Sequence, residues 1–314
     1  MFCDLAFMGG GVRGIGFVGA VKGLEDSGYR VRRTAGTSAG AIVAALVAAG
    51  YSGEEMREEM SRLNYLKFRS KDHANLGLIG EFVNLRRDYG VYSADYFEEW
   101  MHELLVRKGK TTFGDLEGGV DSKKLQLTAA DLLSKRLLVL PEDLRLFGID
   151  PSSYSIAKAV RMSMSIPLFY EAFRLKDIDG IEHLIVDGGL FCNYPIWLLD
   201  DGCGKLDVPT LGLKFVDCKT NVSKRPRKIF RLTDYVVQVI DAVMDAQGHG
   251  YARVTRGDSE RTINVSVCVD GRSVGVTDFG LSDRTADALF DNGYTAAKEF
   301  LSGWDFGKWQ GLRG

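Results

Sequence analysis

A serine stands at the centre of the pentapeptide GTSAG, residues 36–40. A nucleophilic serine on a sharp turn between a strand and a helix needs small neighbours, because bulky side chains would collide where the backbone bends. Gly36, Ala39 and Gly40 meet that need, and a helix beginning at Ala39 would place its first amides beside the hydroxyl. Ser38 is therefore a candidate nucleophile; the alternative is a small-residue turn that serves helix packing.

The proton acceptor for this serine is not an obvious histidine. The chain has four histidines, and none stands in a glycine-rich turn after a strand. His183 precedes Asp187 by four residues in EHLIVDGG, which in a strand separates them by roughly 13 Å, too far to flank one site. Asp187 ends an apolar stretch and precedes two glycines, so it is the candidate base, with a turn-capping aspartate as the alternative.

The glycine-rich stretch GGGVRG has the spacing G-x-G-x-x-G at Gly9, Gly11 and Gly14, between a predicted strand and a predicted helix. A dinucleotide site would need an acidic residue at the end of the second strand. Arg32 and Arg33 stand there, so only an NADP site remains as that alternative. Consecutive glycines at a helix start also leave unhindered amides, which could form an oxyanion hole.

The elements that would position these residues alternate along the chain. Apolar strands are predicted over residues 3–7, 29–34, 124–132, 136–140, 182–189, 210–216 and 262–269. Helices are predicted through residues 12–24, 39–49, 156–165, 231–247 and 283–304, and mixed-charge helical segments at about 51–118. The helix after GTSAG has no polar stripe, so it should be covered on most sides. The alternation favours α/β layers with a largely parallel sheet.

Charge and metal-ligand spacing exclude several classes of function. Among 314 residues, 40 Lys and Arg balance 42 Asp and Glu, so the net charge of −2 gives no overall case for nucleic-acid binding. The basic cluster at 218–231 could meet anionic lipid headgroups, with a solvated loop as the alternative. Cysteines and histidines lack metal-ligand spacing, so no metal and no cofactor is expected.

Cysteine usage and the absence of targeting signals indicate a compartment. Five cysteines form no C-x-x-C pair, and their odd number argues against a disulfide framework. The chain begins without a basic secretory signal, and no apolar run approaches the ~18 residues of a spanning helix. A cytoplasmic location, with peripheral contact at membranes, is therefore expected.

Four motifs in this order, GGGVRG, GTSAG, MSMSIP and VDGG, resemble those of the patatin-like phospholipases, a family of serine acyl hydrolases. The family pattern is a G-G-G-x-R/K-G loop, a G-x-S-x-G turn, an S-x-x-x-P segment and a D-G-G/A turn. The matches lie at residues 9–14, 36–40, 163–167 and 187–189. One small departure is Met162, where the family usually has a small residue. The resemblance extends over about residues 4–215.

This resemblance implies a three-layer α/β/α patatin-like fold with a mostly parallel central sheet and a helical lid or insertion. Residues 1–215 would form the catalytic core, with the helical insertion at about 51–118. Residues 216–314 have no recognisable match, and we expect a C-terminal α/β extension packed on the same domain.

The resemblance also implies a Ser-Asp dyad in which Ser38 is the nucleophile and Asp187 the base. Backbone amides of Gly10 and Gly11 would form the oxyanion hole, with Ala39 as a further donor. Burial is expected to raise the pKa of Asp187 from its ordinary value near ~3.9, since a weaker acid is a better base at neutral pH. The supporting residues would be Gly9, Arg13, Gly36, Gly40 and Gly188, with Arg13 steadying the glycine-rich loop or meeting a headgroup phosphate.

The expected activity is that of a lipid acyl hydrolase of the phospholipase A or lysophospholipase type, acting on phospholipid or another acyl-ester lipid. An apolar acyl pocket would be lined from the region 51–118 and from IPLFYEAF, residues 166–173. Two alternatives remain open. One is a latent patatin-like effector whose lipase activity needs a partner or a signal, and the other is an NADP-binding oxidoreductase.

Overall fold

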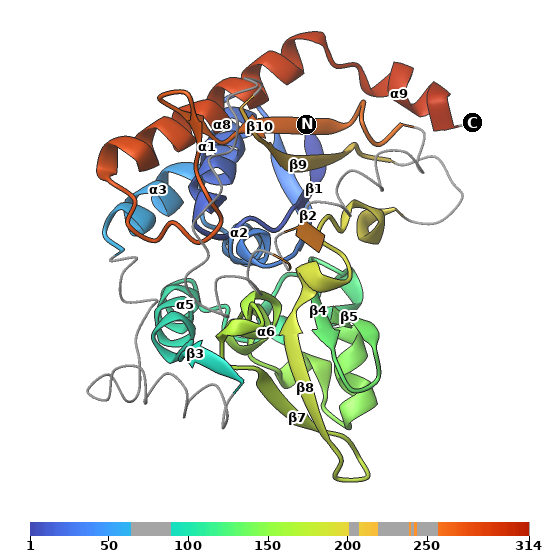
Figure 1. Ribbon diagram of the computed structural model, residues 1–314. Coiled ribbons are helices and arrows are strands. Elements are labelled where there is room, and N and C mark those ends of the chain that lie inside the picture. Colours follow the sequence, from blue (N-terminus) through green and yellow to red (C-terminus); the bar gives the residue numbers. More distant parts are fainter. Residues whose placement is uncertain (64–88, 201–206, 219–238, 240–241, 244–256, 314) are drawn as a thin grey trace.

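The computed structural model describes residues 1–63, 89–200, 207–218, 239, 242–243 and 257–313. An eight-stranded sheet runs through the middle of the molecule (Figure 1), in the order β10-β9-β1-β2-β4-β8-β7 with β5 beside β4. Its strands are β1 (Phe2–Phe7), β2 (Arg30–Gly36), β4 (Leu125–Asp131), β5 (Arg136–Leu140), β7 (Phe173–Lys176), β8 (Glu182–Asp187), β9 (Thr210–Val216) and β10 (Thr262–Ser266).

The sheet is mostly parallel, and its antiparallel part begins at β4. Strands β10, β9, β1, β2 and β4 run parallel to one another, while β5 and β8 pair antiparallel to β4, and β7 antiparallel to β8. Two small sheets lie outside it: β3 (Gly90–Tyr92) with β6 (Leu168–Tyr170), and β11 (Cys268–Val269) with β12 (Arg272–Ser273).

The register along β4 determines how two of these strands meet. Gly36, the last residue of β2, pairs with Leu127, and Asp187, the last residue of β8, pairs with Ala129. Strand β5 occupies the opposite edge of β4 over both positions, so β2 and β8 share one edge. Since β2 runs parallel and β8 antiparallel to β4, their carboxyl ends point toward each other across two residues of β4, about 7 Å.

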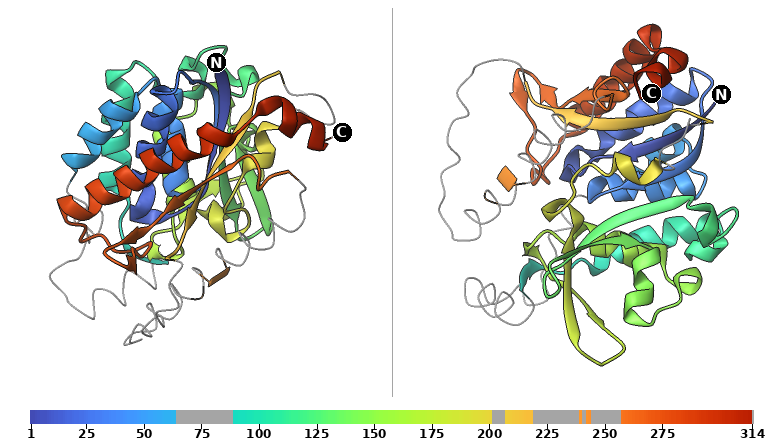
Figure 2. Two further views of the ribbon diagram at one scale, coloured as in Figure 1. Left: turned by 90° about the horizontal axis from the view of Figure 1, so that it is seen from above. Right: turned by 90° about the vertical axis from the view of Figure 1, so that its right-hand side faces the viewer.

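Helices cover the sheet on both faces, as Figure 2 shows from two sides. Helices α1 and α2 lie on one face, and α8 packs on α1, whereas the short helix η9 lies against β1, β2 and β9 on the other. The α-helices are α1 (Ile15–Glu25), α2 (Ala39–Ala48), α3 (Gly53–Ser61), α5 (Asp95–Arg107), α6 (Ile156–Met164), α8 (Asp283–Gly303) and α9 (Phe306–Arg313). The shorter ones are η1 (Gly11–Gly14), η4 (Phe113–Asp115), η5 (Val120–Ser122), η6 (Glu142–Phe147), η7 (Pro151–Ser153), η8 (Gly188–Leu190) and η9 (Ile196–Leu199).

The predicted α/β fold with a mostly parallel sheet is confirmed, and its helices follow from their sequences. Helix α2 is buried over nearly all its length, as its uniformly apolar composition predicts. Helix α3 begins at a capping box formed by Ser52 and Glu55. Within the part of the chain that the structure describes, no helix combines the length and the apolar character needed to cross a membrane.

Four sequence predictions are changed or fall almost entirely outside the described residues. The expected strand 262–269 ends at Ser266, and Cys268 belongs to the separate strand β11. Cys218 and Cys268 form a disulfide with a Cα–Cα distance of 5.1 Å, contrary to the argument from the odd cysteine count. The number of cysteines does not reveal which of them lie close together in the fold. Here the parallel pairing of β9 with β10 brings these two together. The predicted helix 231–247 and the basic cluster 218–231 lie almost entirely outside the described residues.

Candidate active site

Ser38 stands on a strained turn between β2 and α2. Its backbone angles are φ 55° and ψ −125°, a conformation that residues with a side chain rarely adopt. A Cβ on Gly36 would lie 2.4 Å from the carbonyl oxygen of Gly40, and a Cβ on Gly40 would lie 2.4 Å from that of Phe7. The two glycines of GTSAG are thus required by the close passage of neighbouring backbone.

The last turn of α6 and the residue that follows it contact both candidate catalytic residues. The Ser38 amide donates a hydrogen bond to the Ser163 hydroxyl at 2.9 Å. The Asp187 amide donates to the carbonyl of Ser165 at 2.8 Å. The motif S-x-x-x-P, recognised in the sequence without a role, therefore ties the Ser38 turn to the end of β8.

Asp187 reaches the same region because the carboxyl ends of β2 and β8 face each other along β4. Both Asp187 and Ser38 are buried, with 0% and 2% of their surface exposed. One carboxylate oxygen of Asp187 accepts a hydrogen bond from the Gly189 amide at 2.7 Å. The turn-capping role that the sequence left as an alternative is thus present, and it orients the carboxylate.

Threonines bridge the two turns. The Thr37 hydroxyl donates to the carbonyl of Cys192 at 2.9 Å and lies 2.6 Å from the Thr128 hydroxyl. Gly188, the residue after Asp187, lies very close to Thr128. A Cβ on Gly188 would be 2.4 Å from the Thr128 carbonyl oxygen. These contacts fix the position of β8 relative to the residue that precedes Ser38.

The glycine-rich loop lies directly over Ser38. The Gly9 amide donates to the carbonyl of Asn193 at 2.9 Å. A Cβ on Gly9 would lie 3.3 Å from the Ser38 Cβ and 2.2 Å from the Asn193 side-chain oxygen. Gly11, with φ +57°, lines the same pocket as Ser38 and Ala39. A Cβ on Gly10 would lie 2.3 Å from the ring of Phe215, so Gly10 is backed by that ring.

Arg13 supports this loop from within. The side chain is buried, its Nε donates to the carbonyl of Gly10 at 2.9 Å, and its guanidinium lies 5.2 Å from the centre of the Phe215 ring. Steadying the loop, one of the two roles considered for Arg13, is therefore the role that its contacts support.

The arginines of β2 do not offer the phosphate site that an NADP enzyme would need. Arg32 and Arg33 both bind the buried carboxylate of Asp4, at distances of 2.6 and 2.7 Å.

Among the described residues, no cluster of three or more His, Cys, Asp or Glu could hold a metal ion.

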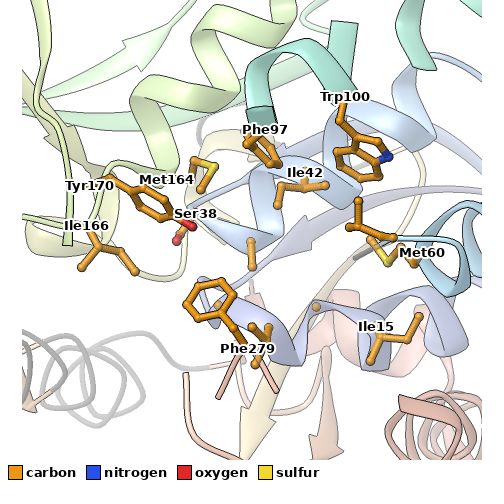
Figure 3. A pocket seen from close by; sticks show the side chains of 15 residues that line it. Ile15, Ser38, Ile42, Met60, Phe97, Trp100, Met164, Ile166, Tyr170 and Phe279 are labelled. Atoms are coloured by element: carbon orange, nitrogen blue, oxygen red, sulfur yellow. The ribbon is translucent and has the colours of Figure 1, made fainter. Parts of the chain in front are cut away.

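An apolar pocket opens from Ser38 (Figure 3). It has an empty volume of about 610 Å³, including its opening to solvent, and its described lining carries no charged side chain. Residues from both expected segments contribute to it, namely Met60, Leu63, Phe97 and Trp100 from the region 51–118, and Ile166 and Tyr170 from IPLFYEAF. Phe169 is not among the described lining residues and instead stacks against Phe279, with ring centres 5.3 Å apart.

Six lining residues were missed in the sequence, namely Val12, Gly14, Ile15, Ile42, Met164 and Phe279. Ile42 follows Ser38 by four residues, so helical spacing could have placed both on one face. Phe279 comes from a loop before α8, where no local pattern signals a pocket.

His183 lies outside this pocket, as its spacing from Asp187 predicts. Its Nδ1 lies 2.7 Å from a carboxylate oxygen of Asp131, and its Nε2 lies 3.4 Å from one of Asp177. Partial burial lowers the pKa of His183, but the hydrogen bonds and charges of the two carboxylates outweigh this and leave the pKa raised. This cluster joins β8 to the end of β4 and to the turn after β7.

The chain is similar to known proteins in sequence and in fold. A family model described as patatin-like phospholipase matches residues 5–200. The chain is 35% identical over 308 residues to the uncharacterized protein YqhO of Bacillus subtilis strain 168, covering 98% of this chain and 100% of YqhO. It is 26% identical over 305 residues to an uncharacterized protein of Acanthamoeba polyphaga mimivirus, covering 94% of this chain and 92% of that one.

Two solved structures share the fold at lower identity. VipD from Legionella pneumophila aligns with a TM-score of 0.56 and 16% identity, covering 96% of this chain and 66% of VipD. ExoU of Pseudomonas aeruginosa, solved in complex with SpcU, aligns with a TM-score of 0.53 and 19% identity, covering 96% of this chain and 52% of ExoU. The chain thus spans just under two thirds of VipD and about half of ExoU.

Proposed function

The chain belongs to the patatin-like phospholipase family, and from that premise we propose that it is a lipid acyl hydrolase that works through an acyl-enzyme on Ser38. One observation carries the proposal: the strained Ser38 turn opens into an apolar pocket beside the glycine-rich loop, while the buried Asp187 comes from the facing strand end.

In the first step, the Ser38 hydroxyl attacks the carbonyl carbon of a fatty-acyl ester and Asp187 takes its proton. Asp187 is fully buried, and the Gly189 amide binds one of its carboxylate oxygens at 2.7 Å, which orients the carboxylate for this transfer. The negative charge that develops on the carbonyl oxygen would be bound by backbone amides of Gly10, Gly11 and Ala39. Gly11 and Ala39 line the pocket beside Ser38, and Ala39 is the first residue of α2.

In the second step, Asp187 returns the proton to the leaving alcohol as the ester bond breaks, and the acyl group stays on Ser38. A water molecule then attacks the acyl carbonyl carbon while Asp187 takes one of its protons. The bond to Ser38 breaks, the fatty acid leaves, and Asp187 returns the proton to the Ser38 oxygen. The apolar lining supports an acyl chain rather than a polar group in the pocket. Phospholipid or lysophospholipid is the proposed substrate, reached by peripheral contact with a membrane.

The test is fatty-acid release from a panel of diacyl phospholipids, lysophospholipids and p-nitrophenyl esters. Wild-type protein should release acid from at least one of them, and Ser38→Ala should lower kcat/KM by at least about 10³-fold. Ser153→Ala, which removes an exposed serine of η7, serves as the matched control and should keep full activity. Turnover retained in Ser38→Ala would overturn the proposal.

A further inference from the structure

Residues 274–279, which we call the covering segment, pass from β12 over the glycine-rich loop. The Val12 amide donates a hydrogen bond to the carbonyl of Val276 at 3.1 Å. A Cβ on Gly11 would lie 2.0 Å from that same oxygen, so the segment leaves no room for a side chain there. The covering segment thus contacts the loop that we propose binds the oxyanion.

Phe279 is the residue of the covering segment that enters the pocket. Only 7% of its surface is exposed, and its ring stacks on Phe169 at an interplanar angle of 11°. Figure 3 shows Phe279 near Ser38, on the wall opposite Phe97. Trp100 lies at the other end of the pocket in the same view. Phe279 therefore bounds the part of the pocket that adjoins the nucleophile.

Contacts on both sides hold the covering segment in place. Before it, Cys268 of β11 is bonded to Cys218, whose amide donates to the Ser273 hydroxyl at 3.0 Å. Within it, the Asp278 carboxylate accepts a hydrogen bond from the Gly275 amide at 2.7 Å. After it, Ser282 caps α8, which packs along α1. Fixed in this way, the Phe279 ring acts as a wall with a defined position.

We propose that Phe279 determines which acyl groups the pocket accepts, by limiting their width next to the ester carbonyl. The inference rests on the proposed function and deepens it, because it predicts that the enzyme prefers straight acyl chains to branched ones. Trp100, at the far end, would limit chain length instead. In an apolar pocket, one added or missing methylene changes the ratio of kcat/KM between two substrates by about 10- to 200-fold. One aromatic ring is therefore sufficient for this role. Phe279 also lies beyond residues 5–200, the part that the family model matches.

The test compares straight-chain p-nitrophenyl esters with esters of equal carbon number branched at the carbon next to the carbonyl. In Phe279→Ala, the ratio of kcat/KM for branched over straight esters should rise roughly tenfold over wild type. In Trp100→Ala, that ratio should stay unchanged while the preferred chain length increases. If Phe279→Ala fails to fold, Phe279→Leu gives a smaller shift in the same direction.

Phe290→Ala is the matched control. Phe290 is also in the C-terminal third and equally buried, with 5% exposed, and its ring packs under the guanidinium of Arg57 at 4.4 Å. It is not among the described residues that line the pocket. This variant should lose stability as Phe279→Ala does, without any change in the ratio. A changed ratio in Phe290→Ala as well would overturn the proposal, because the effect would then follow from lost packing.

A binding assay keeps the inference separate from the proposed function. Branched and straight fatty acids of equal carbon number compete with a fluorescent fatty acid on Ser38→Ala and on Ser38→Ala with Phe279→Ala. The second protein should favour branched acids roughly tenfold more than the first. If wild type hydrolyses no ester, the proposed function fails. The inference is then tested by the binding assay alone, through the ratio of affinities for branched over straight fatty acids. An unchanged ratio in both assays would overturn the inference and leave the hydrolase intact.

Discussion

The two ends of strand β8 each carry an ionisable side chain, but the two side chains have different surroundings. At its start, His183 lies between Asp131 and Asp177, with 13% of its side chain exposed. At its end, Asp187 is fully buried beside the Ser38 turn. The histidine–carboxylate pair that resembles part of a catalytic triad lies outside the pocket, whereas the carboxylate at the other end of β8 lies beside the turn of Ser38, the proposed nucleophile.

The difference shows that strand direction, more than residue type, decides which side chain the fold brings to the Ser38 turn. Strand β8 is antiparallel to β4, so only its carboxyl end meets the carboxyl end of β2. The start of β8 pairs with β7 and lies beside the end of β4. There His183 contacts Asp131 and Asp177 and so links neighbouring segments of the fold.

The largest expected effect separates the carboxylates at the two ends. Asp187→Asn removes the proposed base and should lower kcat/KM for an ester by about 10³- to 10⁴-fold, with little change in Tm. Asp131→Asn removes the negative charge beside His183 and should lower Tm while kcat/KM stays within about threefold of wild type. Steady-state kinetics and thermal unfolding of both variants make the comparison. Loss of activity in Asp131→Asn with retention in Asp187→Asn would reverse the roles of the two ends.

A smaller effect is expected from the glycines next to each end. An alanine at Gly188 would press its methyl group against Thr128 and displace Asp187, so kcat/KM should fall by about 10²-fold. Gly180, in the turn between β7 and β8, has φ +77° and open space around it. Gly180→Ala should therefore destabilise the fold by about 1 kcal/mol through backbone strain and leave kcat/KM unchanged. Equal activity in the two variants would show that the spacing at Gly188 is unimportant.

The smallest expected effect is on stability at the His183 end. His183→Ala should lower the free energy of unfolding by about 1–3 kcal/mol, because it leaves the buried Asp131 without that partner, and should not impair ester hydrolysis. Since the folded pKa of His183 is raised, its protonated form stabilises the fold fully below the unfolded value near ~6.5, and this share is lost as pH rises through the folded pKa.

Urea unfolding at a pH near 5.5 and again near 8.5 measures this dependence. The difference in stability between wild type and His183→Ala should be larger at the lower pH. Both pH values lie well above the ordinary pKa of aspartate, so the carboxylates stay charged throughout. A difference that grows toward the higher pH would contradict the raised pKa.

The sequence predicted the local parts of the fold and site well. The turn at Ser38, the glycines over it and the strand that ends at Asp187 are encoded by neighbouring residues, and all lie where they were expected. The family and the mostly parallel sheet follow from the same motifs. The roles of Ser38 and Asp187 stay predictions until they are measured.

The parts that the sequence did not predict depend on contacts between distant segments. Phe279 joins the pocket only because α8 packs on α1 and carries the covering segment across the glycine-rich loop. Cys218 and Cys268 meet because β9 pairs with β10. Ser163 reaches the Ser38 amide from α6, a contact that its motif does not reveal. Periodicity and motif spacing carry no information on such pairings, which the register of the sheet determines.

The most direct test of the account is covalent labelling with a fluorophosphonate, which loses fluoride to an activated serine and leaves a tetrahedral phosphonyl ester on its oxygen. Intact-mass measurement and peptide mapping should find one adduct per wild-type chain, on the peptide that contains Ser38. The same adduct should form in His183→Ala and be absent from Ser38→Ala. An adduct on another residue, or undiminished labelling of Ser38→Ala, would contradict the assignment of Ser38 as the nucleophile.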